Sequence, residues 1–363
     1  MKSKVYFIRV NDSDSVGIIK SKLERLIRAS EALDFIRKGV RVAMKMHFGE
    51  EGNTGYVRPE YIRAISDNLN KKQADHFLSD TNTLYRGRRT NSTEHLKLAY
   101  EHGFTKEACG SRVLIPDDTK KEEISEVLVN RKFIKTAKIA RIFLEADVIL
   151  GIAHFKGHMM TGFAGALKNI GMGCAAREGK LAQHCDISPF VRIENCIGCK
   201  ECLKVCPMGT VFIKDDKAYI DPEKCIGCAS CIAACVENAI EINWEAGGSN
   251  IQEKMVEYAN AILKDKQSKS VFINFATKIT KECDCLAKDD PRIAPDVGIL
   301  VSIDPVSIDK ASLDLTIEAA GRDIFKEAHP SRDGLKQLRY ACELGLGNLE
   351  YELIEVAPDN DLA

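Results

Sequence analysis

The 363-residue sequence lacks the features that tie a protein to a membrane or a polyanion. No apolar run is long enough to span a bilayer, and the N-terminus, MKSKVYFIRVNDSD, has no uninterrupted apolar core like that of a signal peptide. The formal net charge is only -1, so the whole chain has no attraction for nucleic acid or anionic lipid. We therefore expect a cytoplasmic protein with no membrane span and no nucleic-acid partner.

Two nucleotide-binding motifs are also missing. No predicted strand is followed by G-x-G-x-x-G, and the chain contains no P-loop. The sequence therefore gives no indication of a flavin or of an additional metal ion, although it excludes neither.

Cysteine, in contrast, is abundant. The chain has 14 cysteines, which is high for a cytosolic enzyme unless a metal holds some of them. In a reducing compartment, cysteine spacings indicate metal sites or catalytic thiols before they indicate disulfides.

Eight of these cysteines form a duplicated motif. Residues 196–207 read CIGCKECLKVCP and residues 225–235 read CIGCASCIAAC. Each follows the spacing C-x2-C-x2-C-x3-C, which is typical of bacterial ferredoxins with two [4Fe-4S] clusters. The intervening TVFIKDDKAYIDP predicts two strands joined by an Asp-Asp turn.

The spacing also predicts which cysteines share a cluster. Three thiolates on one tight loop reach one cluster, whereas the fourth cysteine of each motif lies on the following helix and reaches the other cluster. The first predicted set is Cys196, Cys199, Cys202 and Cys235, and the second is Cys225, Cys228, Cys231 and Cys206. Val236 stands where the motif usually has proline, which removes no ligand.

The rest of the chain alternates strand-like and helix-like patterns. This alternation predicts an α/β fold with a mostly parallel sheet and helices on both faces. A long helix is expected to end at Gly39, another to open at Pro59, and a third to run from a cap at Asp304 to Gly321. We expect a discontinuous α/β domain, residues 1–187 plus 246–363, with a small α+β ferredoxin-like domain inserted at 188–245.

Polar side chains follow five predicted strands, at 40–46, 75–79, 147–152, 271–276 and 297–303. Because ligands bind outside the carboxyl ends of parallel strands, we expect these side chains to form one site. The candidates for catalysis are His47, His154, Lys156, His158, Cys283 and Cys285. The candidates for binding a substrate or anion are Asp80, Asn82, Arg86, Arg88, Arg89, Lys168, Asn169 and Asp304.

The segment ECDCL, residues 282–286, allows several interpretations. A disulfide between Cys283 and Cys285 would close a strained ring, and neither cysteine is needed for the two clusters. With Asp284 and an added histidine the pair could hold a metal, or the two residues could be packed thiols. Their position after a strand favours a wall of the active site.

Several long segments resemble one known family. They are KMHFGEEGNTGYVRPEYI, FLSDTNTLYRGRRTNSTEHLKLAYEHGF, HFKGHMMTGFAGALKNIGMGC, the two CIGC units, CDCL and DVGILVSIDPVSIDKAS. The chain resembles the domain-of-unknown-function family 362, in the iron–sulfur subgroup with an inserted bacterial-type 2[4Fe-4S] ferredoxin module. This resemblance implies iron–sulfur binding and specifies no substrate.

Three functions fit these observations. The first is an oxidoreductase that passes electrons from two [4Fe-4S] clusters to an unidentified, anionic substrate or cofactor at the strand-end edge. The second is an electron carrier that docks a partner enzyme, and the third is a redox-sensing or metal-handling protein. An electron donor or acceptor protein is expected as partner, together with a small-molecule substrate in the first case.

Overall fold

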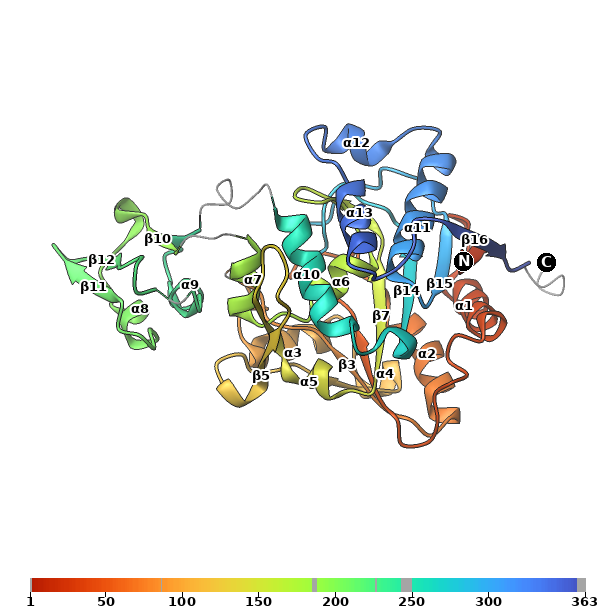
Figure 1. The fold of residues 1–363 in the computed structure, drawn as a ribbon, viewed down its shortest axis with the longest axis horizontal. Coiled ribbons are helices and arrows are strands. Elements are labelled where there is room, and N and C mark those ends of the chain that lie inside the picture. The colour runs from red at the N-terminus through yellow and green to blue at the C-terminus, as the bar shows by residue number, and fades with distance from the viewer. Residues whose placement is uncertain (1, 86, 185–187, 226, 243–249, 358–363) are drawn as a thin grey trace.

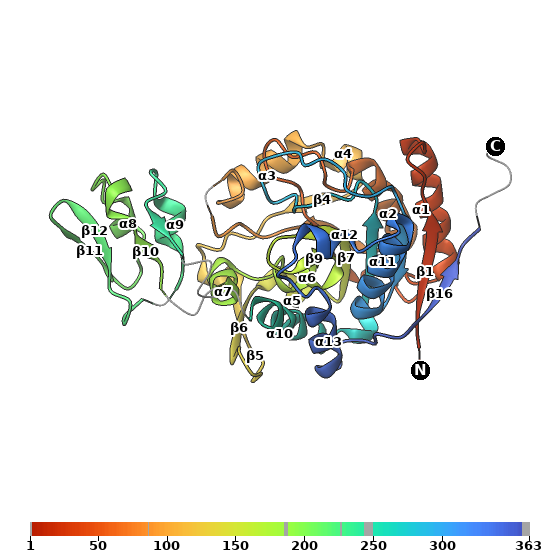
Figure 2. The same ribbon diagram turned by 90° about the horizontal axis from the view of Figure 1, so that it is seen from above.

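The structure is a computed structural model that describes residues 2–85, 87–184, 188–225, 227–242 and 250–357. It has two parts, an α/β body and a cysteine-rich module formed by residues 188–225 and 227–242 (Figures 1 and 2). The body contains chain segments from both sides of the module. The expected boundaries at 187/188 and 245/246 border or fall within stretches outside the described residues, so they remain predictions.

An eight-stranded sheet forms the centre of the body, in the order β16-β1-β15-β14-β7-β2-β3-β4. Its strands are β1 (Ser3–Arg9), β2 (Arg41–Lys45), β3 (Asp75–Ser79), β4 (Arg112–Leu114), β7 (Val148–His154), β14 (Ser270–Ala276), β15 (Gly298–Ser302) and β16 (Tyr351–Glu355). Every described pair is parallel except the two made by β15, which runs antiparallel to β1 and β14. The prediction of a mostly parallel α/β sheet is confirmed.

Helices cover both faces of this sheet (Figure 2). On one face lie α1 (Val16–Ser30), α2 (Pro59–Lys71), α3 (Ser92–Glu101) and α4 (Lys106–Cys109). On the other lie α6 (Ala166–Gly171), α10 (Ile251–Leu263), α11 (Pro305–Ala320) and α13 (Leu335–Glu343). Each set packs its apolar side chains into a separate core, represented by Leu23 and Ile65 on the first face and by Ile170 and Val256 on the second. Burial on both faces explains why the central strands are continuous apolar runs.

The remaining elements of the body are short. They are β5 (Ile124–Leu128), β6 (Thr136–Ala140), β8 (Lys156–His158), β9 (Gly162–Ala164), α5 (Arg141–Glu145), α7 (Arg177–His184) and α12 (Ile324–Ala328). β5 pairs with β6 and β8 pairs with β9, both antiparallel. A single residue separates the end of β7 from the start of the β8–β9 hairpin, so the hairpin carries its side chains directly to the carboxyl edge of the sheet.

Three helix boundaries match the sequence and one does not. α2 opens at Pro59, and α11 is capped by Asp304, which accepts from Val306 N (2.8 Å) and Ser307 N (2.9 Å), and ends at Gly321 with φ of 67°. The prediction of a helix to Gly39 is wrong, because α1 ends at Ser30. Glu31 adopts a left-handed conformation (φ 52°) there, and its N–H closes the last turn.

The cysteine-rich module has its own small elements. They are β10 (Phe190–Val191), α8 (Glu201–Lys204), β11 (Val211–Lys214), β12 (Lys217–Ile220), α9 (Ser230–Ala234) and β13 (Ile240–Glu241). β11 and β12 form the predicted hairpin, and both turn residues, Asp215 (φ 48°) and Asp216 (φ 56°), are left-handed as a tight hairpin turn requires. None of the described module strands pairs with the eight-stranded sheet.

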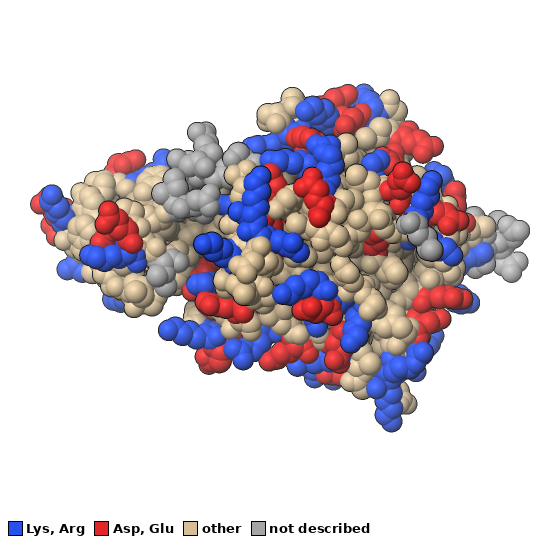
Figure 3. Space-filling model, in the orientation of Figure 1, with Lys and Arg blue, Asp and Glu red and all other residues tan. Residues whose placement is uncertain are grey.

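The surface agrees with the near-neutral composition. On the face shown in Figure 3, acidic and basic side chains are interspersed over the α/β body. Throughout the described ranges, every helix is too short or too polar to cross a bilayer.

Candidate functional site

Four parallel strands, β2, β3, β7 and β14, end at the same edge of the sheet. The segments that follow them therefore meet there, which is where open α/β sheets bind ligands. Most of the predicted site residues on these segments lie in three groups, which we call the Asp80 group, the Asp284 group and the thiol group.

The Asp80 group is a buried carboxylate surrounded by basic side chains. Asp80 accepts from Lys45 Nζ (3.0 Å), and its second oxygen lies 3.0 Å from His47 Nδ1 and 4.0 Å from His95 Nε2. Burial by itself would raise the pKa of Asp80, but Lys45 and His47 outweigh it and hold that pKa well below its usual range. His47 Nε2 is buried and has no hydrogen-bond partner among the described residues.

Arg89 links this group to the loop after β14. Its guanidinium pairs with Glu50 (3.0 Å), lies 3.3 Å from His47 Nδ1 and donates to the carbonyl of Cys285 (3.1 Å). Tyr85 donates to the same carbonyl (2.9 Å). Two loops that are almost 200 residues apart in sequence are thereby fastened together.

The Asp284 group lies on the neighbouring strand ends. Asp284, which is 1% exposed, accepts from Lys156 Nζ (2.7 Å) and lies 3.0 Å from His154 Nδ1. His154 Nε2 donates to the carbonyl of Thr277 (2.9 Å). Burial would raise the pKa of Asp284, but the charges of His154 and Lys156 lower it below its ordinary value.

Acid is expected to destabilise the protein through Asp80 and Asp284. Both pKa values lie below the unfolded value of about 3.9, so the unfolded chain takes up protons first as the pH falls. The contribution of these two carboxylates to the free energy of unfolding should therefore be constant above about pH 5 and fall below about pH 4. Urea unfolding at stepped pH checks this. Asp80→Asn should flatten the slope, whereas the exposed ion-pair partner Asp67, changed to Asn, should leave it unaltered; equal slopes for all three proteins would contradict the assignment.

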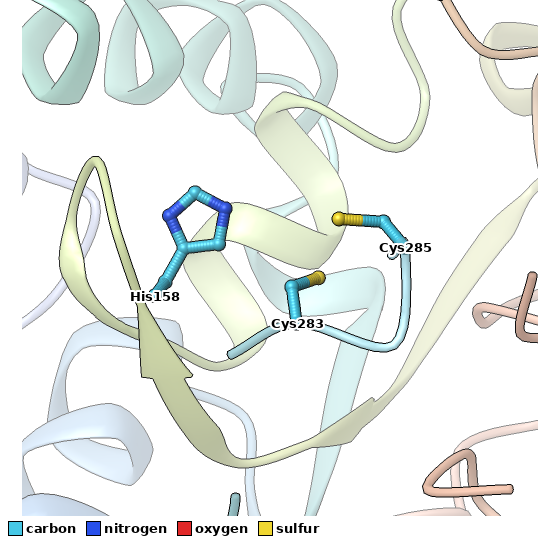
Figure 4. Close-up of side chains that lie close together, drawn as sticks. All are labelled: His158, Cys283 and Cys285. Atoms are coloured by element: carbon cyan, nitrogen blue, oxygen red, sulfur yellow. The ribbon is translucent and has the colours of Figure 1, made fainter. Parts of the chain in front are cut away.

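The thiol group contains His158, Cys283 and Cys285. One ligand-type atom from each lies within 4.8 Å of the other two, and the three side chains are turned toward one another (Figure 4). Lys168 Nζ lies 3.6 Å from Cys283 Sγ. Histidine comes from β8 and both cysteines from the loop after β14, so the group joins two separate segments.

Gly157 explains how these two segments come so close. Its N–H donates to the carbonyl of Thr280 (2.9 Å), and a Cβ at this position would lie only 2.2 Å from the carbonyl oxygen of Lys281. A residue with a side chain would therefore push the β8–β9 hairpin away from the cysteine loop.

The thiol group differs chemically from the other buried cysteines of the body. Burial raises the pKa of Cys109 and of Cys174 to about 12, which makes those thiols inert. At Cys283, a hydrogen bond from Cys285 and the charges of Lys168 and Lys156 lower the pKa well below its usual range despite burial. Cys283 is therefore the more acidic thiol of the pair, because the same hydrogen bond raises the pKa of Cys285 well above its usual range.

The other candidates from the sequence are placed differently. Asn169 holds the framework together, accepting from Lys45 Nζ (2.9 Å) and donating to the carbonyls of Lys45 (3.0 Å) and Ile152 (3.1 Å). Asn82 is buried against the carbonyl of Pro116, and Arg88 pairs at the surface with Glu101. Arg86 lies outside the described residues.

The expectation that Asp304 belongs to this edge is wrong. β15 is antiparallel to β14, so its carboxyl end lies at the opposite edge of the sheet. There Asp304 caps α11 and accepts from Ser3 Oγ (2.7 Å) and Asn348 N (2.8 Å).

Three residues of the site were not among the candidates. Lys45 and His95 contact Asp80, and Lys180 on α7 donates to the carbonyl of Thr81 (3.1 Å). Burial lowers the pKa of Lys180 to about 7. For Lys45 a signal was available, because a lysine inside the mostly apolar strand VRVAMKM requires a partner when it is buried.

A cleft of about 630 Å³ opens on the same edge beside His154. Its lining includes Tyr56, Tyr61, Lys278 and Arg292. A volume of this size suits a small-molecule ligand.

In the module, the first predicted set of cysteines lines one cavity. Cys196, Cys199, Cys202 and Cys235 all contribute to its wall. Burial raises the pKa of Cys202, and so do the charges of Cys199, Cys196 and Cys235. Around Cys231, burial and the nearby thiols of Cys228, Cys225, Cys202 and Cys206 raise its pKa to about 12.

The module packs against the body through apolar side chains. Leu84, in the loop after β3, and Leu181 on α7 belong to the same buried cluster as Cys202, Cys231 and Ile232. α7 lies on the side of the body that faces the module (Figures 1 and 2). The same helix carries Lys180, so it connects the module to the strand-end groups.

The fold and site define an α/β protein with a buried, highly charged strand-end site and an inserted cysteine-rich module. The chain belongs to the family described as a domain of unknown function, DUF362, which it matches over residues 42–314. No curated protein matches the chain.

Two solved structures are similar in outline. The lactate racemase apoprotein from Thermoanaerobacterium thermosaccharolyticum has 14% identity and a TM-score of 0.39, covering 74% of this chain and 50% of its own. A structural-genomics protein from Thermotoga maritima has 13% identity and a TM-score of 0.39, covering 86% of this chain and 60% of its own. The chain thus spans between half and three fifths of the length of these two proteins.

Proposed function

We propose that the protein is an iron–sulfur oxidoreductase whose module is a 2[4Fe-4S] ferredoxin-like insert. The observation that carries this proposal is the cavity lined by Cys196, Cys199, Cys202 and Cys235. Three of these residues come from one motif and the fourth from the other, which is the crosswise arrangement of two-cluster ferredoxins.

The surroundings of the thiols suit iron–sulfur clusters. Backbone N–H groups donate to the sulfurs of Cys196 (from Ala218, 3.4 Å), Cys206 (from Thr210, 3.3 Å) and Cys235 (from Ala239, 3.1 Å). Such bonds stabilise the negative charge that cluster thiolates carry. Gly198 has φ of 70°, and a Cβ there would lie 2.3 Å from the carbonyl oxygen of Asp216, so only glycine lets this loop close over the cavity.

The strand-end site is the proposed destination of the electrons. When bound, the clusters would supply single electrons, received from a donor protein. Leu84 and Leu181 belong to the same group of buried apolar side chains as cysteines of the module. These contacts hold the module against the loops that carry the Asp80 group. Lys168 and Arg89 bring positive charge to the strand-end site, and this charge favours an anionic ligand. His154 borders the cleft, and its two ring nitrogens are held by Asp284 and by the carbonyl of Thr277.

Iron analysis and reoxidation kinetics test this function. Protein purified without oxygen should contain about eight iron and eight acid-labile sulfide per chain. After reduction, its visible absorption should recover faster when the right small anion is added from a panel of carboxylates and phosphates. If no small molecule accelerates this recovery but a copurifying enzyme accelerates it, the protein is an electron carrier and not an oxidoreductase. Absence of sulfide would overturn both.

A further inference from the structure

The thiol group has no role in the proposed clusters. The eight cysteines of the module already supply all eight cluster ligands, and Cys283 and Cys285 belong to the body. Their sulfurs and a ring nitrogen of His158 nevertheless lie within 4.8 Å of one another, in a region where all three residues are buried or half-buried. Such a convergence of two thiols and an imidazole requires an explanation of its own.

The geometry points to a mononuclear site in which His158, Cys283 and Cys285 bind one zinc-type metal ion and leave a fourth position open. Two thiolates and an imidazole are the ligands that zinc prefers. Three protein ligands with one open position are the arrangement of catalytic rather than structural zinc sites. This proposal does not depend on the clusters.

The distances between the three ligand atoms suit a zinc ion after a small contraction. Zinc–sulfur bonds of about 2.3 Å in a tetrahedron place two sulfurs about 3.8 Å apart. The three atoms, mutually within 4.8 Å, therefore need to approach by about 1 Å at most to close on the ion.

The backbone that carries the ligands is already held in place. Asp284, between the two cysteines, is fixed by Lys156 and His154. The Cys285 carbonyl accepts from both Tyr85 and Arg89. In metal sites, hydrogen bonds around the ligands hold the ligands in the right orientation. Here the protein's own residues already make such hydrogen bonds.

The charges identify the kind of ligand that the open position would take. Two thiolates neutralise a divalent ion, and Asp284 neutralises Lys156. Lys168, 3.6 Å from Cys283, is left to supply positive charge beside the metal. An anion such as a carboxylate therefore suits the open position.

One local change must accompany binding. His158 Nδ1 accepts from the N–H of Met160 (3.2 Å). For Nε2 to bind a metal, Nδ1 must carry the ring proton, so this contact has to open. The two residues lie at the turn of the β8–β9 hairpin, where Met159 is 51% exposed.

A different explanation makes Cys283 a free thiolate stabilised by Lys168. The metal site and the free thiolate predict different metal contents and different thiol reactivities. A free thiolate reacts with alkylating reagents whether zinc is present or absent, whereas a metal-bound thiolate is protected.

Zinc loading of the anaerobically purified full-length protein tests the site. After incubation with zinc and desalting, elemental analysis should find about one zinc per chain. The Cys283→Ser, Cys285→Ser double variant should lose it, and Cys342→Ser, a half-buried cysteine on α13, should keep it. Iron and sulfide should be the same in all three, which separates a failure of this site from a failure of the clusters.

A second measurement covers the case in which the double variant does not fold. In the wild type, zinc should block iodoacetamide labelling of Cys283 and Cys285, located by mass spectrometry, without changing that of Cys342. A wild type that retains no zinc, a folded double variant that retains as much as wild type, or labelling unaffected by zinc would each overturn the proposal.

Discussion

Replacing Cys235 with serine is expected to lower the iron content of the anaerobically purified protein from about eight to about four atoms per chain. Cys235 lines the same cavity as Cys196, Cys199 and Cys202, although it belongs to the other motif. A serine oxygen is a hard, poorly acidic ligand in place of a soft thiolate, so the cluster with three remaining thiolates should be lost during purification. Iron and acid-labile sulfide analysis measures the loss.

Double variants reveal which cluster was lost. If Cys235 shares a cluster with Cys196, then Cys196→Ser added to Cys235→Ser should remove no further iron. Cys225→Ser added to Cys235→Ser should remove nearly all of it, because Cys225 belongs to the other set. The reverse result would show that each motif holds its own cluster. Cys342→Ser, outside the module, serves as the control for the loss of a thiol.

Replacing Asp284 with alanine is expected to cost about 3–5 kcal/mol of the free energy of unfolding. Asp284 is buried between Lys156 Nζ (2.7 Å) and His154 Nδ1 (3.0 Å), and alanine would leave the lysine charge buried without a counter-ion. The loop that carries Cys283 and Cys285 would also lose its central anchor. Urea unfolding followed by far-ultraviolet circular dichroism, without oxygen and at neutral pH, measures the effect.

Two further variants show whether the cost comes from the unpaired charge. Asp67→Ala removes an exposed partner of Arg63 and should cost less than about 1 kcal/mol. Lys156→Met combined with Asp284→Ala removes both buried charges and should be more stable than Asp284→Ala alone. If the double variant were the less stable of the two, the cost would lie in packing and not in charge.

The strand-end site combines groups with different tasks. Asp80 and Asp284 hold buried basic side chains in position, and Asn169 ties β2 to β7 through two carbonyls. The cleft beside His154 is open to a ligand, and the thiol group is the proposed metal site.

Local patterns in the sequence determined much of the architecture. The alternation of apolar strands with amphipathic helices was sufficient for a mostly parallel α/β sheet, and Pro59, Asp304 and Gly321 marked helix ends correctly because capping is a local interaction. The duplicated cysteine spacing predicted two sets of cysteines, and the members of the first set line one cavity. Each of these signals depends on residues that are near one another in the chain.

Pairings between distant segments were decided by the tertiary structure alone. The reversed direction of β15 removed Asp304 from the site, because strand polarity depends on which strands pair and not on the strand's own residues. Lys45 and His95 belong to the site because buried polar side chains need a partner, and the fold places Asp80 beside both of them. His158 lies beside Cys283 and Cys285 because Gly157 lets the hairpin of residues 156–164 pack closely against their loop. That loop follows the hairpin by more than 100 residues in the sequence. The chain carries all three ligands, but only folding places them around one point.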